Sequence, residues 1–115
     1  MIGFQWGVFW ANLDPVKGSE QSGRRPVLVI SVEEANSVLP VVTIMAITSL
    51  KPGRKIYPTE VLLPSSETNL SQNSIAMAHQ IRALSKSRLE ENSGEIKSDK
   101  IKNQIREAIR LYFDL

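Results

Sequence analysis

The sequence predicts a mainly β protein, a small barrel-like antiparallel sheet followed by one C-terminal helix. Two observations support this prediction. Short segments rich in β-branched residues alternate with turns that contain glycine and proline, which is typical of short strands joined by tight connections. Clear helical spacing of apolar residues occurs only after Ser98, near the end of the chain. The 115 residues, 42% of them hydrophobic, are enough for one domain spanning 1–115 with a buried core.

The expected strands begin with the apolar segment 8–13, which ends at Asp14 and Pro15 because proline cannot continue a hydrogen-bonded ladder. A polar loop follows. Pro26 then stands at the entrance of the run 27–31, whose continuous hydrophobicity indicates burial on both faces. Further strands are expected at 41–48, 59–63, 74–78 with 80–84 (as one strand or two) and 93–96, with a helical turn or irregular loop at 33–39, a turn-rich segment at 64–72 and a helical turn at 85–89.

The C-terminal helix has a defined start. Ser98 can cap its first turn, and Asp99 lies favourably at the positive end of the helix dipole. One side of the helix carries an apolar stripe, which is expected to dock against the sheet. Its members are Ile101, Ile105, Ala108, Ile109 and Tyr112.

Composition excludes several kinds of site. The chain has no cysteine and one histidine, His79, so thiolate metal sites, zinc clusters and histidine triads cannot be built. No glycine-rich phosphate-binding motif is present. We therefore expect no metal and no cofactor.

The formal charge of +2 is mild, and neither a basic leader nor an apolar run of about 20 residues occurs, so we expect a cytoplasmic protein without a membrane partner.

The polar loop at 18–25 is the most informative stretch of the chain. It begins with a glycine, holds hydroxyl, amide and carboxylate side chains, and ends in Arg24 and Arg25 directly before a buried strand. A guanidinium at the rim of a rigid scaffold fits a phosphate group well, so Arg25 is a candidate phosphate clamp with Arg24 as its flexible neighbour. A solvated loop with two adjacent arginines is the alternative interpretation.

RNA carries its own nucleophile, the 2′-OH, so an RNA-cleaving enzyme must align this hydroxyl, stabilise phosphoryl charge and manage two protons. Thr48, at a strand end, can donate to a phosphate oxygen or satisfy the turn. Glu20 can accept a proton or order the loop, while Ser19 and Gln21 can bond base edges of single-stranded RNA. Lys51 and Lys55, in the basic segment before Tyr57, are candidate RNA contacts or ordinary solvated charge.

A series of short motifs runs in order along almost the whole chain. Each is weak alone, but together they resemble the MazF/PemK family of toxin endoribonucleases. The motifs are LDP at 13–15, GSEQ at 18–21, RPVLVI at 25–30, AITS at 46–49, YPTEV at 57–61, SI at 74–75, QIR at 80–82 and KSRL at 86–89.

The resemblance implies an SH3-like antiparallel β-barrel with a C-terminal helix (the CcdB/PemK-like fold), usually as a homodimer. It implies sequence-specific, metal-independent cleavage of single-stranded mRNA that leaves a 2′,3′-cyclic phosphate and a 5′-hydroxyl, and inhibition by a cognate antitoxin protein. Arg25 and Thr48 match the catalytic pair of the family. The positions that match its RNA groove are Ser19, Glu20, Gln21, Ser74 and Gln80.

Three positions depart from the family pattern: Trp6 before Gly7 replaces a common glycine–aspartate pair, Arg24 replaces a histidine of some relatives, and His79 replaces an acidic residue.

Two other functions stay open. A CcdB-like toxin of the same fold binds DNA gyrase without enzymatic activity, and a plain SH3-like module binds RNA or an acidic peptide without cleaving it. RNA cleavage in the presence of EDTA separates the nuclease from both.

Overall fold

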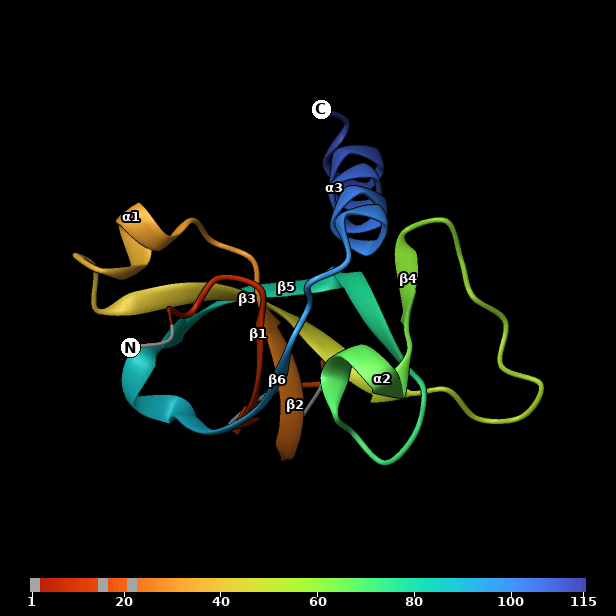
Figure 1. Cartoon of the computed structure of the whole chain (residues 1–115), viewed down its shortest axis with the longest axis horizontal. Coiled ribbons are helices and arrows are strands. Elements are labelled where there is room, and N and C mark those ends of the chain that lie inside the picture. Colours follow the sequence, from red (N-terminus) through yellow and green to blue (C-terminus); the bar gives the residue numbers. More distant parts are fainter. Residues whose placement is uncertain (1–2, 15–16, 21–22) are drawn as a thin grey trace.

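The computed structural model describes residues 3–14, 17–20 and 23–115. Its described residues form an antiparallel sheet of six strands in the order β4-β5-β3-β2-β1-β6 (Figure 1). The strands are β1 (Gly7–Asn12), β2 (Arg24–Val29), β3 (Val41–Ser49), β4 (Glu60–Leu63), β5 (Ser74–Ser85) and β6 (Leu89–Glu95). The helices are α1 (Glu33–Asn36), α2 (Ser65–Thr68), the 3₁₀ turn η1 (Lys86–Arg88) and α3 (Asp99–Phe113). This is the mainly β architecture with a C-terminal helix that the sequence predicts.

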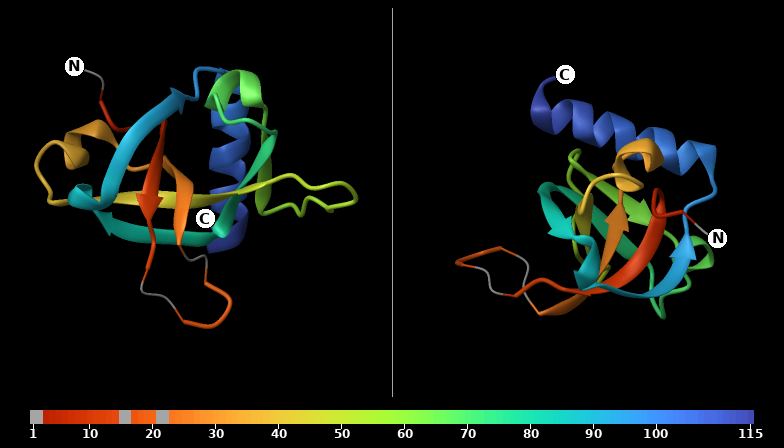
Figure 2. Two further views of the ribbon diagram at one scale, coloured as in Figure 1. Left: turned by 90° about the horizontal axis from the view of Figure 1, so that it is seen from below. Right: turned by 90° about the vertical axis from the view of Figure 1, so that its left-hand side faces the viewer.

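The sheet curves because the pairing between β3 and β5 shifts along its length. Met45 pairs with Ile81, but its neighbour Ala46 pairs with Met77, so β5 carries extra residues at 78–80. Such a bulge bends the strand and increases its twist. A second irregularity interrupts the pairing of β1 with β6. The sheet therefore curls into a barrel-like shape that stays open between its edge strands β4 and β6 (Figure 2).

The sheet buries side chains on both faces. One cluster, the helix-side core, includes Val8, Leu28, Met45 and Ile47 and packs against α3. The other, the far-side core, contains Phe9, Ala11, Val27, Val29, Ile44, Ile75 and Met77, with others. Successive residues of β2 enter the two cores alternately, as the pleat of a strand requires. The predicted burial of this run on both faces is therefore confirmed.

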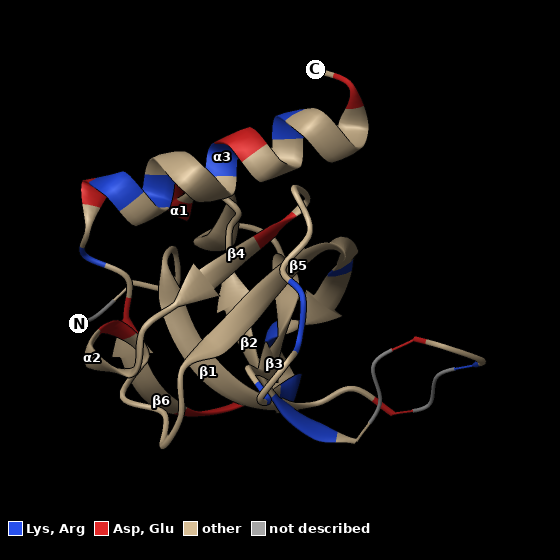
Figure 3. Ribbon diagram, turned by 90° about the vertical axis from the view of Figure 1, so that its right-hand side faces the viewer, with Lys and Arg blue, Asp and Glu red and all other residues tan. Residues whose placement is uncertain are grey.

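Helix α3 lies across the sheet, and charged residues of both signs occur along it (Figure 3). Ser98 caps the helix as predicted, since its Oγ accepts a hydrogen bond of 3.2 Å from the backbone N–H of Ile101. Ile101, Ile105 and Ala108 are buried against the sheet. The prediction that Tyr112 docks on the sheet is wrong, because its side chain is 47% exposed near the end of the helix. Along the described chain, no helix combines the length and hydrophobicity needed to cross a membrane.

Trp6, one of the departures from the family pattern, ties α3 to the start of the sheet. Its backbone has a φ of 67°, which is unusual for a bulky residue. Hydrogen bonds of 2.8 Å on either side hold it there, from its N–H to the carbonyl of Val29 and from the N–H of Ile96 to its own carbonyl. Lys102 and Arg106 of α3 lie over its indole ring.

Several element boundaries differ from the sequence predictions. Strand β2 begins at Arg24, so both arginines belong to the strand, and Pro26 pairs with Trp10 inside the ladder. β5 is one continuous strand despite its bulge. The segment 64–72 contains the short helix α2, and β6 begins at Leu89 instead of 93. These polar segments lack a periodic apolar signal, so only their pairing partners define them.

We predict that Ile105→Ala lowers the free energy of unfolding by about 2–5 kcal/mol, because the side chain is fully buried between α3 and the sheet. Chemical denaturation measures this difference. Leu111→Ala on the same helix is the matched control, since Leu111 is 58% exposed. Equal losses in the two variants would contradict the docking of α3 through its buried stripe.

Candidate functional site

Arg25 and Thr48 lie on neighbouring strands at the same end of the sheet. Strand β2 pairs with β3 through Val27 and Ala46, and continuing this register by two residues sets Arg25 across from Thr48. Their outer neighbours in the same row are Ala11 and Ile75, both members of the far-side core. Both side chains are half-buried, and both line one pocket of about 510 Å³. The two residues expected to be catalytic therefore share a cavity.

The rest of this pocket, which we call the arginine pocket, is rich in uncharged polar groups. Ser49, Ser71 and Ser74 bring hydroxyls, Gln72 brings an amide, and Trp10 of β1 brings an aromatic ring. No carboxylate or imidazole belongs to its described lining. Nor do the described residues hold a cluster of three or more histidines or carboxylates able to bind a metal ion. The chemistry that this lining offers is the binding of an anion by a guanidinium and hydroxyl donors.

Arg24 also lines the arginine pocket, but its hydrogen-bonding edge is directed elsewhere. Its Nε donates to Oε1 of Glu90 at 2.7 Å, and its Nη2 donates to Oε1 of Glu91, both on β6. These carboxylates raise the pKa of Arg24, with the hydrogen bond to Glu90 as the main cause. The guanidinium carbon lies 4.6 Å from the ring centroid of Trp10. Arg24 is thus held in place, instead of being the flexible neighbour of Arg25 that the sequence suggests.

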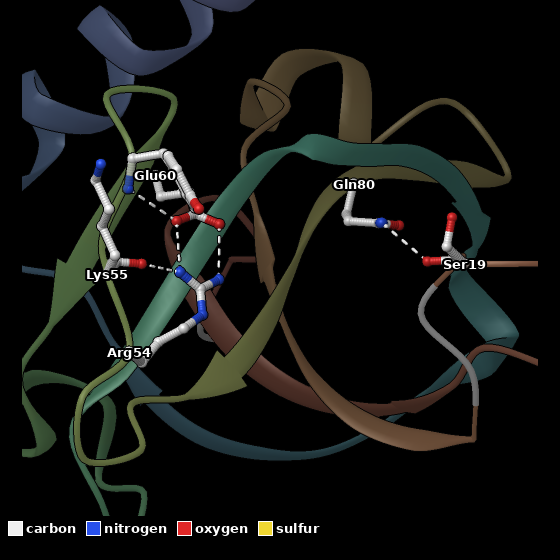
Figure 4. Close-up of polar contacts among 6 residues, drawn as sticks. Ser19, Arg54, Lys55, Glu60 and Gln80 are labelled. Atoms are coloured by element: carbon white, nitrogen blue, oxygen red, sulfur yellow. Dashed lines mark hydrogen bonds and ion pairs between the residues drawn. The ribbon is translucent and has the colours of Figure 1, made fainter.

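A second pocket, of about 380 Å³, contains three more of the predicted RNA-binding residues. Ser19, Glu20 and Gln80 line it together with His79, Arg82 and Tyr112. The Nε2 of Gln80 donates to the backbone carbonyl of Ser19 at 3.4 Å, so the loop and β5 meet here (Figure 4). In their described parts, this pocket and the arginine pocket have no lining residue in common. Gln21, predicted to read a base edge, falls outside the described residues.

The two predicted lysines take different positions. Lys51 lines a third pocket, of about 700 Å³, which shares Ser49, Ser71 and Gln72 with the arginine pocket. Lys51 therefore lies beside the arginine pocket. Lys55 lies outside these three pockets, and its ammonium group is 5.4 Å from the ring centroid of Tyr57.

Hydrogen bonds to the backbone hold the two ends of the β1–β2 connection. Arg82 donates to the carbonyl of Leu13 at 3.1 Å, and Arg88 donates to the carbonyl of Asp14 at 2.6 Å. The N–H of Gly23 donates to Oδ1 of Asp14 at 2.9 Å. Arg82 and Arg88 thus contribute to structure, although the sequence shows them only as part of a basic cluster. Their contacts hold the segment after β1, and Asp14 of that segment bonds to Gly23 just before β2.

The basic connection between β3 and β4 is held by an ion pair. Arg54 donates from Nη1 and Nη2 to the two oxygens of Glu60 at 2.9 and 2.8 Å (Figure 4). The N–H of Tyr57 donates to the same carboxylate at 3.0 Å. Glu60 is only 6% exposed. The hydrogen bonds from Arg54, more than any other contact, lower the pKa of Glu60.

A comparison with protein families matches residues 4–113 to the model of a PemK-like, MazF-like toxin of a type II toxin–antitoxin system. The chain belongs to this family. It is 39% identical over 108 residues to the endoribonuclease MazF of Staphylococcus saprophyticus, a match that covers 94% of this chain and 88% of the relative. The sequence-based recognition of the MazF/PemK family is thereby confirmed.

Solved structures of MazF proteins share the fold. A crystal structure of MazF from Deinococcus radiodurans superposes with a TM-score of 0.80 and 28% identity, covering 100% of this chain and 99% of the other. A crystal structure of MazE–MazF from the same organism gives a TM-score of 0.74 at 28% identity, covering 100% and 98%. The predicted fold class is confirmed, with the sheet open between β4 and β6.

Sequence reasoning missed several residues that line the pockets. Trp10 lies inside the expected first strand, and the sequence does not distinguish it from the apolar residues around it. In the structure it is half-buried. Ser71 and Gln72 lie in a segment that was interpreted only as a turn. Tyr112 was assigned to the docking stripe of the helix, yet it lines the second pocket. One pattern in the sequence could have indicated Trp10. Side chains alternate along a strand, so Trp10 lies on the face of β1 opposite to Phe9.

We predict that Glu60→Gln lowers the free energy of unfolding at pH 7. The difference in this free energy between variant and wild type becomes smaller as the pH falls below about 4. The pKa of Glu60 is lowered on folding, so its contribution is present above its unfolded pKa and is lost as the carboxylate becomes protonated in the folded state. Denaturant unfolding at pH 7 and pH 3 measures both differences. Glu95→Gln, at an exposed position of β6, controls for the loss of one carboxylate. A difference that stays constant over this range would contradict the assigned cause.

Proposed function

We propose that this chain is the toxin of a type II toxin–antitoxin system and cuts single-stranded RNA, including mRNA, as an endoribonuclease. One observation supports this most: Arg25 and Thr48 line one pocket together with hydroxyls, an amide and the guanidinium of Arg24, in a chain of the MazF-like family. The similar protein of S. saprophyticus bears the name endoribonuclease. Residues 1–115 act as one MazF/PemK-like domain in this proposal, since the family match already spans 4–113.

The proposed reaction uses the 2′-OH of the RNA as nucleophile. Its oxygen attacks the adjacent phosphorus, the bond from phosphorus to the 5′ oxygen breaks, and the products are a 2′,3′-cyclic phosphate and a 5′-hydroxyl. The guanidinium of Arg25 stabilises the charge that grows on the non-bridging oxygens, and the hydroxyl of Thr48 donates to one of them. The 5′ oxygen takes up a proton as it departs, from Arg25 or from water. Arginine is already protonated, so the proton of the 2′-OH passes to another group, and that general base is left open.

No metal ion is needed in this mechanism, because the nucleophile belongs to the substrate and the positive charge belongs to Arg25. The remaining barrier is lowered by alignment of the 2′-OH with the bond that breaks. We therefore propose that cleavage persists in EDTA. This property would separate the enzyme from nucleases that depend on metal-bound water.

The RNA strand is proposed to extend from the arginine pocket toward its neighbours. Ser74 lines the arginine pocket itself, and Lys51 lines the pocket that adjoins it. Ser19, Glu20 and Gln80 line the second pocket, where amide, hydroxyl and carboxylate groups can bond base edges. Gln21 and Lys55 complete the proposed RNA-binding set, and Lys55 acts through its charge on the backbone.

The proposed partners are a second copy of the chain and a cognate antitoxin. A MazE–MazF structure from D. radiodurans resembles this chain along its full length. The antitoxin is proposed to carry an acidic segment that covers the basic pockets and folds on binding. The proposed compartment is the cytoplasm, where mRNA is found.

Arg25→Ala is expected to lower the rate of RNA cleavage by about 10²-fold or more, because the charge that stabilises the phosphoryl oxygens is removed. Thr48→Ala is expected to lower it less, since a hydroxyl donor contributes less than a guanidinium. The assay incubates a long single-stranded RNA with the protein in EDTA and maps the new 5′ ends, which should carry hydroxyls. Arg110→Ala, on the exposed side of α3, is the control for loss of one arginine.

Circular dichroism and thermal unfolding establish that each variant is folded. Full activity of a folded Arg25→Ala variant would exclude the proposed role of Arg25. RNA that stays intact with the wild-type protein, together with inhibition of DNA gyrase, would favour the CcdB-like alternative. Binding of RNA without cleavage, unaffected by Thr48→Ala, would favour a simple binding module.

A further inference from the structure

Arg24 and Arg25 are adjacent in sequence but have different surroundings. Alternation along β2 places Arg25 in the row of the far-side core and Arg24 in the row of Pro26 and Leu28. Both line the arginine pocket, which lies at the first residues of β2. The two guanidinium groups therefore reach the pocket from different rows of β2.

Two in-plane donors of Arg24, on its Nε and Nη2 edge, already have partners. Its Nε and Nη2 donate to Glu90 and Glu91, two carboxylates on β6. An arginine binds phosphate through these same in-plane N–H groups, usually two at a time. A phosphate approaching this edge would meet two negative charges instead of free donors. This edge of Arg24 is thus poorly suited to the phosphate-binding role that its sequence position suggests.

The guanidinium, in contrast, lies over an aromatic ring. Its central carbon is 4.6 Å from the ring centroid of Trp10. The side chain as a whole remains 47% exposed, and it belongs to the lining of the arginine pocket. The two carboxylates tie the guanidinium to β6. A guanidinium that lies over an aromatic ring and stays accessible offers a planar surface for stacking beside the proposed site of cleavage.

We propose that Arg24, supported by Trp10, is a stacking surface for a nucleobase of the RNA next to the scissile phosphate. Single-stranded RNA is commonly bound by stacking of splayed bases on aromatic rings and on guanidinium planes. The inference rests on the proposed endoribonuclease function and adds a residue that contributes to substrate specificity. Because stacking grows with the size of the ring system, a purine is preferred over a pyrimidine at this position.

The decisive variant is Arg24→Lys, which keeps the positive charge but removes the plane. Once the cut site is mapped, short RNAs are made that contain it, either intact or with an abasic nucleotide on one side of the scissile phosphate or the other. Arg24→Lys is expected to lower kcat/KM on intact RNA by about tenfold or more, mainly through KM. On the RNA that lacks the stacked base, wild type and variant are expected to cleave equally. Arg110→Lys, an exposed arginine paired with Glu107, is the matched control.

If Arg24 binds phosphate instead, Arg24→Lys will change cleavage of the intact and the abasic RNAs by the same factor, and that result overturns the proposal. Trp10→Leu provides a second variant that removes the support and should show the same dependence on the same base. Thermal unfolding of each variant shows whether it is folded.

A binding experiment separates this inference from the proposed function. Wild type and Arg24→Lys are compared for binding to oligoadenylate and oligouridylate of equal length, which requires no cleavage. A preference of the wild type for the purine strand that the lysine variant loses supports the stacking surface. Equal binding of both strands by wild type, or a preference that Arg24→Lys leaves intact, contradicts it. Failure to cleave any RNA bears only on the proposed enzymatic function.

Discussion

The pairing of β2 with β3 is the constraint on which the candidate site depends. Because the side chains of a strand alternate between faces, a slip of one residue would exchange the two cores and move Arg25 away from Thr48. Val27, Leu28 and Val29 are fully buried and divided between the two cores, so such a slip would require both cores to repack. Packing of apolar side chains therefore determines where the charged and hydroxyl groups of the site lie.

The same sheet also holds the connections around the site. Arg82 and Arg88, from β5 and the turn after it, bond to backbone carbonyls at the end of β1, and Arg54 fixes the β3–β4 connection through the buried Glu60. Arginines thus serve several purposes in this protein. Those whose donors bond to backbone carbonyls and to a buried carboxylate hold the connections between strands. Arg25 lines the pocket with hydroxyl neighbours and is suited to phosphate.

The contrast between Arg24 and Arg25 follows from strand geometry. One peptide bond separates them, yet the pleat directs them to different sides, and Arg24 meets Glu90 and Glu91 on β6. A pair of like residues in sequence therefore has two environments: a guanidinium paired at its edge, and another in a pocket without carboxylates in its described lining. Charge alone does not distinguish them, and neither would a count of basic residues.

The sequence by itself determined the strands at 8–13, 27–31 and 41–48, the capped helix after Ser98 and the family, because apolar periodicity, capping residues and ordered motifs are local signals. It also indicated Arg25 and Thr48 as a candidate pair, and the fold brings them to one cavity. Only the tertiary structure decided that β6 starts at Leu89, that Trp10 and Gln72 line this cavity, that Ser19 and Gln80 face a separate pocket, and that Arg24 is held by two carboxylates. These features depend on contacts between segments far apart in the chain, and such contacts leave no local pattern in the sequence that contains them.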